Sequence, residues 1–166
     1  MGYVHAQAQL GILYECGTGT KKDYNRALEW YLKAVNQESP DAMYRLGKMY
    51  SSGKGVSQDY KKAIDYYTMC AEKGNAWACL ELGEINYYGL GVKNNAEEAN
   101  NWYTKAFEKG NNRIKITIAE KYENGDGIAQ DENKAYELYK IIAESGNTYA
   151  QNKVEMYDLG IRKASN

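Results

Sequence analysis

The stretch YSSGKGVSQDYKKA, residues 50–63, contains the glycine-rich interruption that decides the fold. The same spacing of G-x-G, a later Asp or Asn and a later Ala is found at residues 14–27, 86–99 and 122–135. Gly53 is predicted to end a helix in the left-handed conformation, Gly55 to let the chain reverse, and Asp59 to cap the next helix. The interruption therefore predicts the joint of a helical hairpin.

The whole chain of 166 residues repeats with a period of 36. Three columns hold this period without insertion or deletion: Leu10, Leu46, Leu82, Ile118 and Val154; Ala27, Ala63, Ala99 and Ala135; and Tyr31, Tyr67, Tyr103 and Tyr139. A period of roughly 20 to 50 residues is typical of stacked repeats, in which each unit buries its apolar face only against its neighbours. We therefore predict an all-α protein, an α/α superhelical solenoid of helix-turn-helix repeats.

This period predicts one domain, residues 1–166, with four full repeats and a C-terminal capping helix. The predicted repeats are about 3–38, 39–74, 75–110 and 111–146, followed by a cap helix at about 147–160 and a tail at 161–166. Two sets of glycines have predicted roles. Positive φ at the ends of the second helices is expected of Gly74, Gly110 and Gly146. Close approach of a neighbouring helix is expected at Gly11, Gly47 and Gly83, inside the first helices.

The segment AMYRLGKMYSSGKGVSQDYKKAIDYY, residues 42–67, resembles the Sel1-like repeat family, which is related to the tetratricopeptide repeats. The resemblance covers nearly the whole chain. Two departures are Asn86, in a tyrosine column, and Ala119, in the column of Gly11, Gly47 and Gly83. The resemblance implies an adaptor that assembles protein complexes, and it does not identify a partner.

Composition argues against nucleic acid and membrane as partners. The chain has 21 Lys plus Arg against 22 Asp plus Glu, a net charge of −1 and a pI of about 5.9, so broad attraction to polyanions is not expected. An RNA-reading helical repeat stays a less favoured alternative, since such arrays present regular basic and base-stacking columns. No apolar run reaches the roughly 18 residues of a membrane helix.

Two features of the sequence bear on the compartment. The start, MGYVHAQAQLG, does not read as a signal peptide. Cys16, Cys70 and Cys79 form no CxxC motif, which favours free thiols in a reducing, cytoplasmic compartment. An exported or luminal protein whose leader has been removed stays open, as does a pairing of Cys70 with Cys79.

No catalytic or metal constellation is indicated. His5 is the one histidine, so neither a His-based triad nor a multi-histidine metal site can be assembled from one chain. The segment ENGDGIAQDE, residues 123–132, lacks the ligand order of an EF-hand. We expect no cofactor, no metal and no enzyme activity, with a small hydrolase on a helical-repeat scaffold as the alternative.

The candidate partner-binding residues are positions that the repeat framework leaves free. If the first helices line the concave face, positions five before, two before, two after and five after the leucine column look inward. The predicted site residues are Tyr44, Lys48, Trp77, Leu80, Glu84, Tyr87, Arg113, Glu120 and Tyr149. Large aromatic residues and arginine are enriched at interface hot spots, so a protein or an extended peptide is the expected partner.

Overall fold

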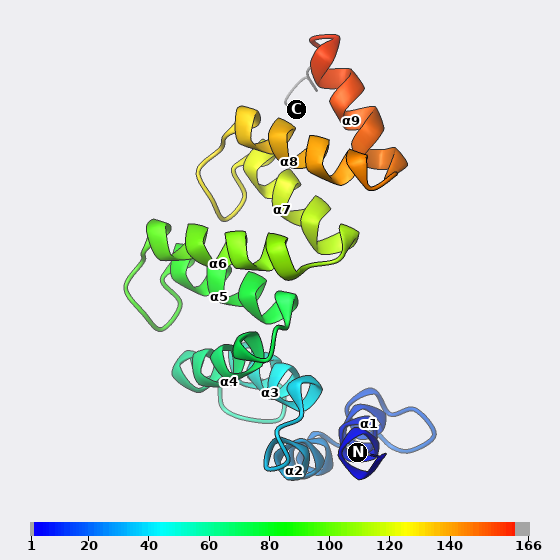
Figure 1. Ribbon diagram of the computed structural model, residues 1–166. Coiled ribbons are helices and arrows are strands. Elements are labelled where there is room, and N and C mark those ends of the chain that lie inside the picture. Colours follow the sequence, from blue (N-terminus) through cyan, green and yellow to red (C-terminus); the bar gives the residue numbers. More distant parts are fainter. Residues whose placement is uncertain (1, 162–166) are drawn as a thin grey trace.

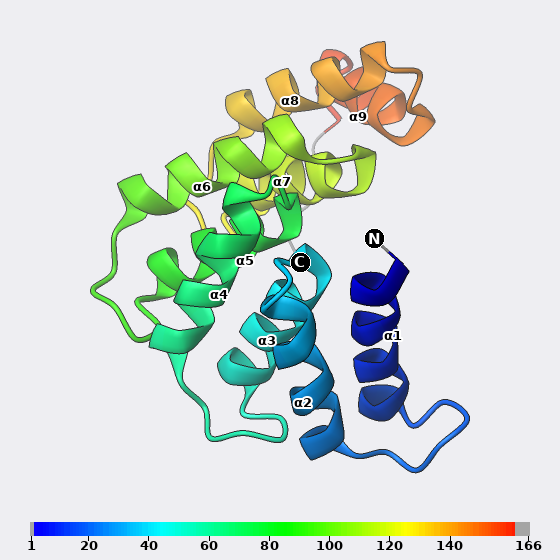
Figure 2. The same ribbon diagram turned by 60° about the horizontal axis from the view of Figure 1, so that its bottom comes forward.

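A computed structural model describes residues 2–161, which form nine helices and no strand (Figure 1). The helices are α1 (Gly2–Cys16), α2 (Tyr24–Val35), α3 (Pro40–Ser52), α4 (Tyr60–Glu72), α5 (Ala76–Tyr88), α6 (Ala96–Lys109), α7 (Asn112–Asn124), α8 (Glu132–Glu144) and α9 (Thr148–Asp158). They follow one another in a curved stack of hairpins, seen from two directions in Figures 1 and 2. The predicted all-α solenoid is confirmed. Within the described residues, no helix is both long enough and apolar enough to cross a membrane.

The hairpin joint of the second repeat has the predicted geometry. Gly53 ends α3 with φ of 70°, and its N–H donates to the carbonyl oxygen of Met49. The Asp59 carboxylate accepts a hydrogen bond from the backbone N–H of Lys62 at 3.1 Å, which caps the start of α4. These contacts satisfy backbone groups that a helix end leaves without an intrahelical partner. The expectation for residues 50–63 is thus confirmed.

Gly53→Val is expected to lower the free energy of unfolding by more than about 1 kcal/mol, because a β-branched side chain is strained at positive φ. The control is Lys54→Ala in the same loop, which should stay within about 0.5 kcal/mol because Lys54 is exposed. Urea denaturation of both variants measures the difference. Equal losses would contradict the left-handed helix end.

The glycines inside the first helices make room for the tyrosine column. A Cβ atom on Gly47 would lie 2.5 Å from the ring of Tyr67 in the second helix of the same repeat. The corresponding distances are 2.4 Å between Gly11 and Tyr31 and 2.5 Å between Gly83 and Tyr103. Each of these rings is fully buried. The predicted close approach is confirmed, and it explains why glycine and tyrosine recur together.

Gly110 corrects one sequence prediction. Gly74 and Gly146 take positive φ, at 90° and 83°, but Gly110 has φ of −79° and ψ of 153°. Helix α6 continues to Lys109, so Gly110 is the extended residue that leads into α7. Its Cβ would lie 2.6 Å from the Ala106 carbonyl oxygen. Glycine is therefore needed here for space and not for its left-handed conformation.

The three cysteines are free thiols in the structure. Cys16 is exposed, whereas Cys70 and Cys79 are buried. The Cys70 thiol donates to the carbonyl oxygen of Pro40 at 3.1 Å. Burial raises the pKa of Cys70 to about 12 and also raises the pKa of Cys79. Since the thiolate is the reactive form, both act as small packing residues.

Candidate binding surface

The first helices of successive repeats contact one another through side chains at every junction. We call the solvent-facing sides of α1, α3, α5, α7 and α9 the first-helix face. The contacts join α1 to α3, α3 to α5, α5 to α7 and α7 to α9. This face is therefore one continuous surface that crosses the repeats, and its chemistry is set by residues that vary between them.

At the first junction, Glu15 connects three elements. Its carboxylate accepts a hydrogen bond from the hydroxyl of Tyr31 in α2 at 2.5 Å. The same oxygen lies 3.5 Å from the guanidinium of Arg45 in α3. Burial and this carboxylate together raise the pKa of Tyr31. A framework tyrosine is thus anchored by a carboxylate that the next repeat neutralises.

At the second junction, Tyr44 in α3 donates to the carboxylate of Glu81 in α5 at 3.1 Å. The ammonium of Lys48 lies 5.9 Å from the centroid of the Tyr44 ring. Burial raises the pKa of Glu81, and the positive charge of Lys48 opposes that rise. Lys48 itself is exposed. This junction presents a half-buried ring beside a cation that solvent can reach.

At the third junction, an arginine covers a tryptophan. The guanidinium of Arg113 in α7 lies 5.6 Å from the ring centroid of Trp77 in α5. Trp77 is half-buried and packs against the hydrophobic core, whereas Arg113 is exposed. Stacked cations of this kind stabilise an exposed pair by about 0.5 to 1 kcal/mol. The pair forms an apolar and cationic spot on the surface.

A buried lysine lies deeper in the same junction. Lys121 is 7% exposed, and its ammonium pairs with Glu84 at 2.8 Å and with Asp126 at 3.5 Å. Burial opposes its charge, but Glu84 and Asp126 together outweigh burial and raise the pKa of Lys121. Asp126 also accepts a hydrogen bond from Tyr88 at 3.0 Å. Lys121 therefore stays charged inside a satisfied polar cluster.

Next to this cluster, the Tyr103 hydroxyl is buried and has no hydrogen-bond partner among residues 2–161. The other framework tyrosines are bonded by a residue five positions after the leucine column. These partners are Glu15, Ser51 and Glu123. In the third repeat the same column holds Tyr87, whose ring packs edge-on against Tyr88 with 5.1 Å between centroids. Tyr87 thus stands in the column whose other members bond a framework tyrosine, and its ring packs against Tyr88 instead.

The fourth junction is the most heavily bonded. Glu123 in α7 lies 2.7 Å from the ammonium of Lys153 in α9 and accepts from the Tyr139 hydroxyl at 2.9 Å. Glu120 accepts from the Tyr149 hydroxyl at 2.7 Å. Burial and this bond raise the pKa of Tyr149 to about 12. These bonds attach the last helix to the array.

The structure brings most predicted site residues onto the first-helix face. Half-buried or exposed on it are Tyr44, Lys48, Trp77, Glu84, Tyr87, Arg113, Glu120 and Tyr149. Leu80 is a correction, because it is 6% exposed and belongs to the hydrophobic core. Ala8, in the same column, is 1% exposed. The position two before the leucine column is therefore not reliably accessible.

Sequence reasoning missed the position directly before the leucine column. Three charged side chains occupy it and bond to the preceding repeat: Arg45, Glu81 and Lys153. The sequence does contain a signal. Arg45 follows Glu15 by 30 residues and Lys153 follows Glu123 by 30 residues, so opposite charges recur at one spacing.

The chemistry of the face suits recognition. Within residues 2–161, no three His, Cys, Asp or Glu side chains are placed to hold a metal ion. His5 is exposed, and its imidazole lies 3.5 Å from the Gln9 amide. Glu84 and Glu123 are neutralised by lysines instead of standing beside a nucleophile. Such groups can bind and orient a partner by hydrogen bonds, ion pairs and aromatic contacts.

Comparison with known proteins decides the family. The family described as Sel1 repeat matches residues 4–39, 40–75, 78–111 and 119–147. The chain belongs to the Sel1 repeat family. Proteins with Sel1 repeats are generally protein-interaction scaffolds. No curated protein matches the chain.

Solved structures agree with this assignment. A Sel1 repeat protein from Oxalobacter formigenes is 35% identical, with a TM-score of 0.73 over 93% of this chain and 64% of that one. The protein c5321, a protective antigen of uropathogenic Escherichia coli with an SLR fold, is 32% identical, with a TM-score of 0.76. That match covers 98% of this chain and 35% of c5321. The Sel1 chain described here is therefore shorter than both relatives.

The fold extends to more distant proteins. Cysteine-rich protein B of Helicobacter pylori is 21% identical, with a TM-score of 0.54 over 79% of this chain and 94% of that one. At this identity the likeness concerns the fold alone.

Proposed function

We propose that this Sel1 repeat chain is a non-catalytic scaffold that binds an extended segment of another protein along the first-helix face. We further propose that this face is the concave side of the solenoid. The observation that carries the proposal is the line of accessible aromatic and cationic side chains that crosses the junctions. Its members are Tyr44, Lys48, Trp77, Arg113 and Tyr149. Aromatic residues and arginine are the types that dominate interface energies.

The spacing of the helices suits an extended ligand. Adjacent packed helices lie about 8 to 10 Å apart, and an extended chain advances about 3.3 Å per residue. About three residues of a partner would therefore pass each first helix. Lys48 and Arg113 offer donors, and Glu120 offers an acceptor, to the polar groups of such a segment. The ring of Trp77 offers apolar contact beside them.

The two alternative functions have less support. A hydrolase needs a nucleophile held by a base, whereas the carboxylates of this face are bonded to Lys121, Lys153 and tyrosine hydroxyls. An RNA reader needs a basic column, whereas the position of Arg113 in its column is occupied by Asp41 and Trp77 in other repeats. Screens with ester, peptide and phosphate substrates and a titration with RNA test both alternatives.

Trp77→Ala and Arg113→Ala are each expected to weaken partner binding by about 1 to 3 kcal/mol, because each removes half of the stacked pair. The partner is a peptide selected on the parent protein from a random library, and calorimetry measures its affinity. Lys93→Ala is the control, since Lys93 is exposed in the loop between α5 and α6. The control should bind like the parent.

Each variant must stay folded, because Trp77 also packs against the core. Thermal melts of the variants check this. Asn94 is a poorer control than Lys93, because its amide donates to the backbone carbonyl of Tyr87. The proposal is wrong if folded Trp77→Ala and Arg113→Ala proteins bind like the parent while Lys93→Ala loses the peptide.

A further inference from the structure

The hairpin between α1 and α2 differs from the other three hairpins at two framework positions. In the first of these columns, Thr20 stands where the other repeats have an apolar residue. Those residues are Val56, Val92 and Ile128. In the second column, Lys22 stands where the other repeats have a side-chain amide. Those residues are Gln58, Asn94 and Gln130. Lys21, between them, adds another cation next to these departures.

In the other repeats these two columns close the hairpin on itself. Gln58 donates to the carbonyl oxygen of Ser51 at 2.8 Å, and Gln130 donates to that of Glu123 at 2.9 Å. Ile128 is 2% exposed and Val56 is half-buried against the core, whereas Val92 is 38% exposed. In the first hairpin the ammonium of Lys22 lies over the ring of Tyr24 instead, and Thr20 is exposed. The first hairpin thus has solvent-facing polar groups where the second and fourth hairpins have a packed apolar residue and an amide bonded to the backbone.

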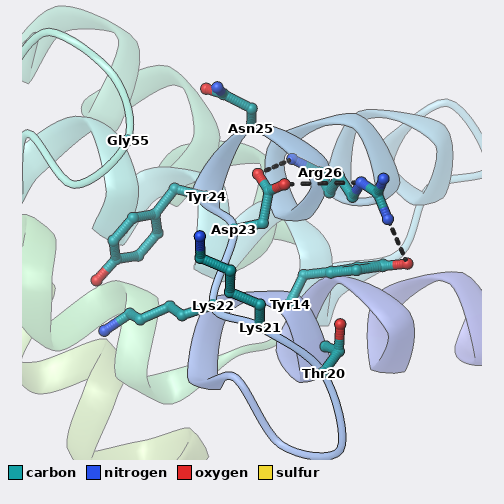
Figure 3. A pocket seen from close by; sticks show the side chains of 9 residues that line it. All are labelled: Tyr14, Thr20, Lys21, Lys22, Asp23, Tyr24, Asn25, Arg26 and Gly55. Atoms are coloured by element: carbon teal, nitrogen blue, oxygen red, sulfur yellow. Dashed lines mark hydrogen bonds and ion pairs between the residues drawn. The ribbon is translucent and has the colours of Figure 1, made fainter.

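A cavity of about 570 Å³ lies at this hairpin (Figure 3). Its walls are the end of α1, the loop, the first turn of α2 and Gly55 of the next repeat. A Cβ atom on Gly55 would lie 2.3 Å from the Cβ atom of Tyr24. Glycine therefore allows the second hairpin to approach Tyr24, and the cavity is formed by two repeats together.

The side chains around this cavity are mainly cationic. Lys21, Lys22 and Arg26 line it, with Asp23 as the one carboxylate among its lining residues, so the local formal charge is +2. The Asp23 carboxylate is already engaged, because it accepts from the Arg26 backbone N–H at 3.0 Å and pairs with the guanidinium at 3.6 Å. The positive end of the α2 dipole adds to the same field.

Two tyrosines position the cations. The guanidinium of Arg26 lies 5.4 Å from the ring centroid of Tyr14 and donates to its hydroxyl at 3.4 Å, as Figure 3 shows. The ammonium of Lys22 lies 4.8 Å from the ring centroid of Tyr24. Lys22 and Arg26 are thereby held at the cavity instead of extending freely into solvent.

We propose that this cavity binds a phosphate group, as the free dianion or as a monoester. The charge of the site matches that of a dianion, and the ammonium, guanidinium and Thr20 hydroxyl donors match its several acceptor oxygens. The cavity also leaves room for part of the group that carries the ester. This site is separate from the first-helix face, and it does not depend on the function proposed for that face.

Calorimetric titration of the whole chain with inorganic phosphate and with O-phosphoserine at low ionic strength tests the proposal. We expect saturable binding by the parent. The decisive variant is Thr20→Val with Lys22→Gln, which gives the first hairpin residues found in the second. It should lower the affinity by at least about tenfold, because it removes one cation and one hydroxyl donor.

Lys93→Ala is the matched control, since Lys93 occupies the column of Lys21 in the third repeat. It should leave the affinity unchanged, whereas Lys21→Ala should lower it several-fold. Lys21 is exposed, so Lys21→Ala also decides the question if the double variant fails to fold. Thermal melts identify that case.

The two ligands distinguish the source of the phosphate. Tighter binding of O-phosphoserine supports a monoester carried by a larger molecule, and equal binding supports the free ion. The proposal is overturned if the parent binds neither ligand at millimolar concentration. It is also overturned if a folded Thr20→Val and Lys22→Gln protein, or a folded Lys21→Ala protein in its place, binds as tightly as Lys93→Ala.

Discussion

Tyr67→Ala is expected to lower the free energy of unfolding by about 3 to 5 kcal/mol, the range for removing a buried aromatic side chain. The Tyr67 ring is fully buried and lies over Gly47, with no side chain between it and the α3 backbone. Its centroid is 5.9 Å from that of the Tyr44 ring, and its hydroxyl lies 3.2 Å from the Ser51 hydroxyl. Alanine would leave a cavity between α3 and α4. The two helices could close this cavity only by moving relative to each other. Guanidinium denaturation measures the loss.

Two control variants separate the parts of this effect. Tyr67→Phe removes only the hydroxyl and should cost about 0.5 to 1.5 kcal/mol. Tyr3→Ala removes a tyrosine that is 84% exposed and should change stability by less than about 0.5 kcal/mol. If Tyr67→Ala costs no more than Tyr67→Phe, the packing of the ring over Gly47 does not stabilise the repeat.

This glycine and tyrosine pair shows why the fold could be predicted from the sequence. A helix interior tolerates glycine at a cost of about 1 kcal/mol, so its recurrence at Gly11, Gly47 and Gly83 indicates a gain that outweighs the cost. The gain is contact with a ring from the second helix of the same repeat. Local rules for helix ends, as at Gly53 and Asp59, then place the joints. Three of the four repeats contain the pair, with Ala119 as the exception, and all four contain the glycines of the joint. The prediction therefore does not depend on any single copy.

The candidate site could be predicted only in part, because it depends on the direction in which each side chain points. The spacing of residues along the sequence does not determine that direction. Leu80 and Glu81 are neighbours in sequence, but Leu80 enters the core and Glu81 bonds to Tyr44 of the preceding repeat. The crossing angle between neighbouring helices decides which of two adjacent positions faces outward. That angle cannot be obtained from the 36-residue period of the sequence. The extended conformation of Gly110 is a similar case, since it depends on where α6 ends.

Glu123→Ala is expected to lower the free energy of unfolding by about 3 kcal/mol, because it leaves a buried ammonium without its anion. The side chains of Lys153 and Glu123 are 9% and 19% exposed and lie 2.7 Å apart. The same carboxylate accepts from the hydroxyls of Tyr139 and Tyr157, at 2.9 and 3.4 Å. One substitution thus removes the acceptor for three donors and should loosen α9 first. Hydrogen exchange along α9, with urea denaturation of the whole chain, measures both effects.

Glu15→Ala is the matched control, since Glu15 occupies the same column in the first repeat. Its cation, Arg45, lies 3.5 Å away and is 35% exposed. Water can therefore solvate the guanidinium after the change, and the cost should be nearer 1 kcal/mol. Each carboxylate also bonds a framework tyrosine. The difference between the two variants therefore measures the burial of the cation together with the extra bond from the Tyr157 hydroxyl to Glu123.

Adding Lys153→Met to Glu123→Ala tests the cause directly. If the buried ammonium produces the loss, replacing it with an apolar side chain of similar length should recover about half of the stability, leaving the tyrosine hydroxyls as the remaining cost. If the double variant is no more stable than Glu123→Ala, the tyrosine hydroxyls account for the whole effect. The ion pair would then contribute nothing to holding α9, and a neutral acceptor such as Glu123→Gln should be nearly as stable as the parent.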